Sequence, residues 1–185
     1  MDFYIGTYTH EFESKGIYRA SLQLDTGTLE PAELVAELDN PSFLALDSVK
    51  PFLYSVSEKE EAELVSFRIE DNGQLTRIDS VKTGGSSACH LTPSQDGRFL
   101  YATNYGDGSV VIAELSNDGS FKAGVKVIQH VGSSINPERQ EGPHAHSAII
   151  DPFGSRLLVA DLGIDRIVRS EEHTSELQSH SDLVC

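Results

Sequence analysis

Positive charge is scarce in this 185-residue sequence. It has 14 Lys and Arg residues against 29 Asp and Glu residues, which gives a formal net charge of −15. A nucleic-acid-binding domain draws most of its affinity from clustered Lys and Arg side chains that neutralise phosphates. The charge balance therefore argues against a nucleic-acid partner.

Long apolar runs and cysteines are also scarce. No run approaches the roughly 20 apolar residues that cross a bilayer. The first six residues, MDFYIG, lack the basic and apolar regions of a secretion signal. Two cysteines, Cys89 and Cys185, are too few for a disulfide framework and suit a reducing compartment. We therefore expect no membrane association and a cytoplasmic location.

Helical periodicity is missing before Arg169. Instead, Val65, Phe67 and Ile69 alternate with polar neighbours, as expected of a half-buried strand. Prolines fall at turn-like positions between such segments. The sequence predicts an all-β fold.

The last seventeen residues, 169–185, differ from the rest in composition and periodicity. They read RSEEHTSELQSHSDLVC, which is polar and has neither strand nor helix periodicity. With one choice of codons, their back-translation resembles a sequencing-library adapter, and we prefer this interpretation to a charged C-terminal helix. We therefore expect a non-native, irregular tail and a functional domain at 1–168. Removing the one arginine and four acidic residues of the tail leaves a net charge of −12.

One turn motif recurs at a constant spacing. It is Asx-x-Gly, at 25–27, 71–73 and 117–119, and its successive glycines lie 46 residues apart. Glycine adopts positive φ without strain, and an Asx side chain can bond its own backbone, so each motif predicts a hairpin. A fixed period of this size indicates a repeat architecture.

The strands around these turns repeat as well. The segments at 52–54, 99–101 and 157–159 align with one another, and 64–67 aligns with 109–112. A repeat of about 46 residues with about four short strands is typical of a β-propeller blade. A β-sandwich, the alternative, gives no reason for the equal spacing of one turn motif.

The fold that we expect is an incomplete β-propeller. Its blades cover 1–39, 40–85 and 86–141, and a fourth blade begins at Gly142. Residues 1–168 thus supply about three and a half blades, fewer than a closed ring needs. An open arc leaves strand edges unpaired.

Several segments resemble the β-propeller lactonase family. They are YIGTYT at 4–9, TNY at 103–105 with GSV at 108–110, and, most specifically, NPERQEGPHAHS at 136–147. The likeness continues through VADLGIDRI at 159–167.

The resemblance implies a closed seven-bladed propeller, which at this period needs about 320 residues. This chain would be its N-terminal half. The family's best-known activity is 6-phosphogluconolactonase: hydrolysis of 6-phosphoglucono-1,5-lactone to 6-phosphogluconate in the pentose phosphate pathway, without metal or organic cofactor. The implied partner is the sugar-phosphate lactone, and we expect the intact protein to be a monomer. We expect the fragment alone to be inactive, because half of the channel wall is missing.

Two other functions remain open. A muconate-lactonizing cycloisomerase, which the same family resembles, would use a similar cluster for proton transfer. A non-enzymatic propeller would instead bind a partner protein. Such a scaffold has no need to gather Arg139, His144 and His146 at one channel mouth, so neutral replacements there would leave its partner binding intact.

The third repeat carries an insertion. The interval from Tyr101 to Val159 exceeds the preceding one by about ten residues, which places the insertion near 129–141. Insertions in repeat proteins usually map to the binding face.

Arg139 and Glu141 lie in this insertion, which leads into His144 and His146. The i, i+2 spacing puts both imidazoles on one side of an extended segment. His90 occupies the corresponding entry of the preceding blade. The three imidazoles are therefore expected to converge on the central channel.

Lactone hydrolysis needs a base, a holder for the anionic substrate and an oxyanion donor. Arg139 suits a phosphate or carboxylate fork. His146 or Glu141 is the candidate general base, and His144 the oxyanion donor or acid. His90 and Asn104 are candidate substrate contacts.

Each assignment has a structural alternative. The His pair could bond blade turns or hold a metal, although two His alone are a weak zinc pattern. Arg139 could be a solvated loop residue, and Glu141 is more doubtful still. Asn104 and Asp161, at matching positions after successive strands, could face the channel or satisfy turn backbones. We favour the turn role for both.

Overall fold

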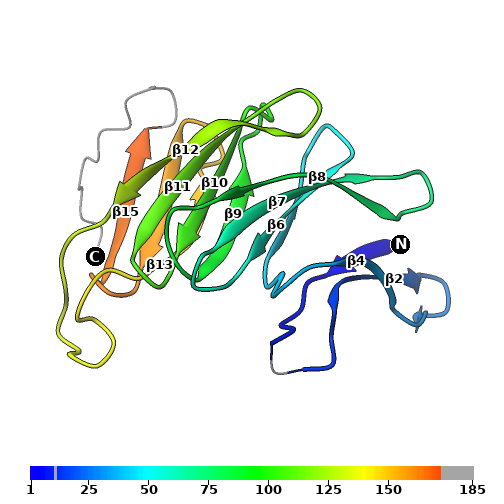
Figure 1. Cartoon of the computed structure of the whole chain (residues 1–185), viewed down its shortest axis with the longest axis horizontal. Helices are drawn as coiled ribbons and strands as arrows, with labels where there is room; N and C mark the ends of the chain where they lie inside the picture. Colours follow the sequence, from blue (N-terminus) through cyan, green and yellow to red (C-terminus); the bar gives the residue numbers. More distant parts are fainter. Residues whose placement is uncertain (11, 172–185) are drawn as a thin grey trace.

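The computed structural model describes residues 1–10 and 12–171, which form fifteen β-strands in four antiparallel sheets. We call these sheets blades 1 to 4. Figure 1 shows them following one another from the blue N-terminal strands to the orange strands of blade 4. Within the described residues no helix is long and apolar enough to span a membrane. The predicted all-β, incomplete propeller is confirmed.

Blades 1 and 2 hold the first eight strands. Blade 1 comprises β1 (Asp2–Ile5), β2 (Gly16–Gln23), β3 (Thr28–Leu29) and β4 (Glu33–Glu37), with β3 and β4 both paired to β2. Blade 2 comprises β5 (Leu44–Leu46), β6 (Phe52–Ser57), β7 (Glu63–Ile69) and β8 (Leu75–Lys82), paired in that order.

Blades 3 and 4 hold the remaining strands. Blade 3 comprises β9 (Ala88–Pro93), β10 (Phe99–Asn104), β11 (Ser109–Leu115) and β12 (Phe121–Gln129). Blade 4 comprises β13 (Ala145–Ile150), β14 (Arg156–Asp161) and β15 (Arg166–Glu171). β15 includes residues 169–171, so the first three residues of the expected irregular tail pair with β14. The rest of that segment, 172–185, lies outside the described residues.

The hydrophobic core lies between neighbouring blades. Along β6, Leu53 packs toward Ile17 and Val35 of blade 1, whereas Tyr54 and Val56 pack against blade 3. Blades 3 and 4 share a third cluster. Because successive strand residues point to opposite faces, one strand contributes to two cores at once.

This packing corrects the expectation that β7 is half-buried. Val65 and Phe67 are buried as predicted, but Leu64 and Ser66 are fully buried too. A central blade is covered on both faces by its neighbours, so the polar position at Ser66 is buried, whereas Arg68, nearer the end of the strand, is exposed as predicted. Ser66 Oγ has no hydrogen-bond partner.

The repeated turns form the predicted hairpins. Gly27, Gly73 and Gly119 have φ values of 68°, 80° and 88°, in the left-handed region that glycine tolerates. They connect β2 to β3, β7 to β8 and β11 to β12.

The opposite end of the blades carries the connections between blades. In an antiparallel meander, the connections at 38–43, 83–87 and 130–144 lie at the same end as the turns at 105–108 and 162–165. Backbone hydrogen bonds confirm this arrangement, since Tyr105 N–H donates to Ser87 O over 2.9 Å and Leu162 N–H donates to His144 O over 3.0 Å. We call this end the linker end. The predicted insertion is the long connection 130–144.

Candidate functional site

The insertion 130–144 is an ordered loop closed by its own hydrogen bonds. Gln140 N–H donates to Asn136 O over 2.7 Å, and Asn136 N–H donates to Gln140 Oε1 over 3.0 Å. Ser134 N–H donates to Gln140 O over 2.9 Å. This compact turn presents Arg139 at the surface, where its side chain is exposed.

Asp161, at the end of β14, anchors this region. Its carboxylate is fully buried and accepts hydrogen bonds from the backbone N–H groups of His144, Gly163 and Ile164 over 2.8, 3.0 and 3.3 Å. The predicted turn role of Asp161 is confirmed by its bonds within the 162–165 turn. His130 Nδ1 lies 2.6 Å from the other carboxylate oxygen, a contact that the sequence analysis did not foresee.

His144 stands between blades 3 and 4. Its ring stacks on Tyr105 with centroids 4.7 Å apart, and Nδ1 donates to Tyr105 O over 2.8 Å. A carbonyl only accepts, so Nδ1 carries hydrogen and Nε2 is left to exchange a proton. Glu141 Oε1 lies 3.5 Å from that Nε2, on an exposed side chain.

His146 and Arg139 meet at one cavity. Both line a pocket of about 690 Å³ together with Asp161, Leu162 and Arg166. The ring of His146 also contacts Tyr105 edge-on, with centroids 5.9 Å apart. His144 and His146 therefore share one aromatic neighbour.

His90 lies beside these residues on β9. Its ring packs on Phe43 with centroids 4.2 Å apart, and Nδ1 accepts a hydrogen bond from Ala148 N–H over 3.3 Å. Burial, with a further contribution from the His146 imidazole, lowers the pKa of His90 from 6.5 to about 4. His90 is therefore neutral at pH 7 and brings no positive charge to an anionic substrate.

We expect acid to destabilise the fold through His90. An unfolded histidine binds its proton near pH 6.5, whereas folded His90 binds it only near pH 4. Between these values the unfolded state holds more protons, so the free energy of unfolding falls as the pH falls. In His90→Asn, Oδ1 takes the place of Nδ1 without titrating, and this component should vanish. Urea denaturation at about pH 7 and about pH 4.5 compares the two proteins, and equal acid losses would contradict the prediction.

Asn104 is not at the cavity surface. Its side chain is fully buried, and Nδ2 donates to Ser109 Oγ over 2.9 Å, within the β10–β11 turn. Asn104 Oδ1 is buried without a hydrogen-bond partner. The structure thus places Asn104 in the turn role that the sequence analysis favoured.

Three residues that the sequence analysis did not select lie at the linker end. Tyr105 contacts both His144 and His146. Tyr8 Oη donates to Glu58 Oε2 over 2.9 Å, and Ser42 Oγ donates to the same oxygen. Glu58 and Tyr105 each follow the second strand of their blade directly, and Tyr8 lies in the loop after β1. The aligned repeats could have identified Glu58 and Tyr105, one residue beyond the position considered for Asn104.

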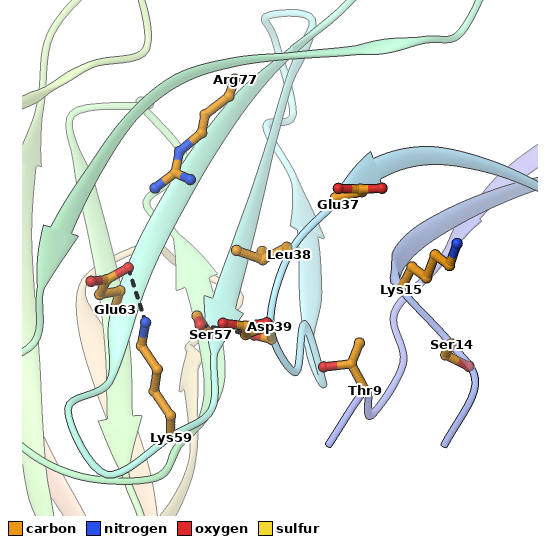
Figure 2. A pocket seen from close by; sticks show the side chains of 10 residues that line it. All are labelled: Thr9, Ser14, Lys15, Glu37, Leu38, Asp39, Ser57, Lys59, Glu63 and Arg77. Carbon is orange, nitrogen blue, oxygen red and sulfur yellow. Dashed lines mark hydrogen bonds and ion pairs between the residues drawn. The ribbon is translucent and has the colours of Figure 1, made fainter. Parts of the chain in front are cut away.

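A second pocket, of about 570 Å³, lies between blades 1 and 2 (Figure 2). Side chains of both charges line it, and Lys59 Nζ pairs with Glu63 Oε2 over 3.4 Å. Arg77 and Lys15 project from β8 and from the β1–β2 loop. None of the predicted site residues lines this pocket. Throughout the described residues, no group of three or more His, Cys, Asp or Glu side chains is placed to hold a metal ion.

Comparison with known proteins identifies the fold and the family. Residues 2–183 match the family model described as Lactonase, 7-bladed β-propeller. The chain is 32% identical over 166 residues to a Bacillus subtilis protein named 6-phosphogluconolactonase, covering 89% of this chain and 47% of that protein.

Solved structures give the same picture. A Bacteroides uniformis protein superposes with a TM-score of 0.90 and 30% identity, covering 99% of this chain and 54% of its own. A periplasmic gluconolactonase from Pseudomonas aeruginosa superposes with a TM-score of 0.88 and 30% identity, covering 96% and 52%. The chain thus spans about half the length of the relatives that it matches.

Proposed function

Because this chain belongs to the seven-bladed β-propeller lactonase family, we propose that the complete protein hydrolyses a sugar lactone, with 6-phosphoglucono-1,5-lactone as its substrate. The observation that carries the proposal is that Arg139 and His146 line one pocket, while His144 and His146 both contact Tyr105. A cation, a base and a second imidazole are the groups that this hydrolysis requires.

His146 is the proposed general base. Its ring is exposed to the pocket, and within residues 1–10 and 12–171 no hydrogen bond occupies its ring nitrogens. It takes a proton from water as the water oxygen attacks the lactone carbonyl carbon. The ring C–O bond then breaks and the proton passes to the departing ring oxygen, which leaves a carboxylic acid and a hydroxyl group. Glu141 is the alternative base.

His144 is the proposed partner for the developing oxyanion or for the leaving oxygen. Its Nδ1 hydrogen is committed to Tyr105 O, which fixes the ring orientation and leaves Nε2 for the reacting group. Stacking on Tyr105 restricts the ring further. With hydrogen already on Nδ1, Nε2 donates to the reacting oxygen only when the ring holds a second proton, so His144 would act as an acid. An acid held in place before the reaction contributes more than one that must reorient.

Arg139 is the proposed phosphate contact. Its guanidinium has no acidic partner among the described residues, and a planar fork matches phosphate geometry. In a protein of net charge −15, an anionic substrate needs such a local positive focus. Arg166 lines the same pocket and is a second cation there.

The test is a hydrolysis assay on the complete protein. Resequencing across codon 168 with independent primers recovers the full reading frame, and the expressed protein is assayed with 6-phosphogluconolactone and with unphosphorylated gluconolactone. Preference for the phosphorylated lactone supports the proposal. Preference for gluconolactone, after which the Pseudomonas relative is named, would change the substrate assignment. Inactivity toward both would favour the cycloisomerase or the protein-binding propeller.

We further propose that the complete protein is cytoplasmic and monomeric. A cytoplasmic location and a monomeric state rest on the sequence alone, and the Pseudomonas relative is named as periplasmic. Size-exclusion chromatography with light scattering of the complete protein tests the monomer, and cell fractionation tests the location.

A further inference from the structure

We infer that His130 and Asp161 are positioning residues, which latch the insertion 130–144 onto blade 4 and thereby hold Arg139 at the pocket and the His144 ring against Tyr105. The link to catalysis rests on the proposed function. The latch itself is a property of the fold and can be tested without any substrate.

The latch is a buried pair formed by His130, the first residue of the insertion, and Asp161, the last residue of β14. His130 Nδ1 and Asp161 Oδ2 are 2.6 Å apart, and their side chains are 6% and 0% exposed. A carboxylate withdrawn from water is costly unless hydrogen bonds satisfy it. Undocking the insertion would remove the His130 bond from a buried charge, so the docked position is strongly preferred.

The same carboxylate also bonds the C-terminal end of the insertion, at His144. Asp161 Oδ1 accepts the His144 N–H over 2.8 Å, and Leu162 N–H donates to His144 O over 3.0 Å. Gln140 Nε2 donates to Leu162 O over 2.8 Å. The turn after β14 is therefore hydrogen-bonded to Gln140, which is next to Arg139, and to His144, which stacks on Tyr105.

The insertion and the turn after β14 are in close main-chain contact at Gly163. A β-carbon at Gly163 would overlap the carbonyl oxygen of Gly142 and crowd the His144 nitrogen. The loop and the turn therefore touch through their main chains, and glycine at 163 is required for this approach.

The carboxylate of Asp161 stays ionised in this environment. Burial acts to raise its pKa, but the bonds from the His130 ring and from the His144 and Ile164 N–H groups outweigh burial, so the pKa lies below its ordinary value. The acceptor for all these groups is thus present at neutral pH.

Limited trypsin digestion of the complete protein tests the latch, because trypsin cleaves after Arg139 once the loop can open. Mass spectrometry follows that cut and the cut after Arg156, on β14 of the same blade, as an internal reference. We expect His130→Phe to speed cleavage after Arg139 about tenfold through local opening and to leave Arg156 unchanged. We expect His130→Asn, whose Nδ2 replaces Nδ1, to restore slow cleavage.

A second test of the latch compares the same substitution at two buried carboxylates of blade 4, Asp161 and Asp151. Asp161→Asn keeps Oδ1 for the backbone N–H groups but loses the charge that faces His130. Asp151→Asn makes the same change at a buried turn carboxylate at the other end of blade 4. We expect faster cleavage after Arg139 only in the first variant.

Kinetics then connect the latch to the site. We expect His130→Phe to raise KM for the phosphorylated lactone more than it lowers kcat, because Arg139 is released, and His130→Asn to reverse this. Unchanged cleavage after Arg139 in His130→Phe, equal acceleration after Arg156, or no rescue by His130→Asn would overturn the latch. Altered cleavage in a protein without lactonase activity would support the latch and reject only the proposed function.

Discussion

Replacement of His146 by alanine in the complete protein is expected to lower the turnover of 6-phosphogluconolactone by about a hundredfold or more, the usual contribution of a positioned general base. The side chain is exposed and lines the same pocket as Arg139, and its ring meets Tyr105 edge-on. The loss should therefore fall on kcat, with little change in stability. Steady-state kinetics with a thermal melt of each protein provide the measurement.

His10→Ala is the control for His146→Ala. His10 is also exposed, but it lies in the β1–β2 loop and its backbone bonds Asn40. This variant should keep full turnover. If His146→Ala remains active, the base is not His146, and Glu141→Gln becomes the variant to measure.

The second large effect is expected at Arg139. Arg139→Gln should raise KM for the phosphorylated lactone by about tenfold to a hundredfold, since a charge-assisted hydrogen bond contributes about 1.5–3 kcal/mol. KM for unphosphorylated gluconolactone should change little. The ratio of kcat/KM for the two lactones isolates the phosphate contact.

Arg77→Gln is the matched control for this change. Arg77 is exposed on β8 and lines the separate pocket between blades 1 and 2. It should leave both lactones unaffected. An equal loss on both lactones in Arg139→Gln would place that guanidinium on the lactone ring and not on the phosphate.

The repeat could be predicted because its signals are local. Glycine at the third position of each Asx-x-Gly turn adopts positive φ, as at Gly73 and Gly119, and such a requirement is visible in a short window of sequence. The insertion at 130–144 could be located by spacing alone. Burial on both faces of β7 could not be predicted in this way, because it depends on the two neighbouring blades.

The candidate site was predicted in part. The spacing of His144 and His146 indicated that they share a side, and both contact Tyr105. Asn104 was placed among the substrate contacts, yet it is buried in the β10–β11 turn, whereas Tyr105 reaches the imidazoles. One residue of register at a strand end decides which side chain points inward, and a repeat alignment without structure does not resolve it.

The sequence by itself determined the β-repeat, its period, the family resemblance and the cluster of Arg139, His144 and His146, since each is written in neighbouring residues. Only the tertiary structure decided that His130 bonds Asp161, which lies 31 residues away, and that both hold the insertion against blade 4. It also decided that His90 is half-buried beside His146, which lowers the pKa of His90 to about 4 and leaves the ring neutral at pH 7. These outcomes depend on packing between blades, where burial and hydrogen bonding are set by distant segments.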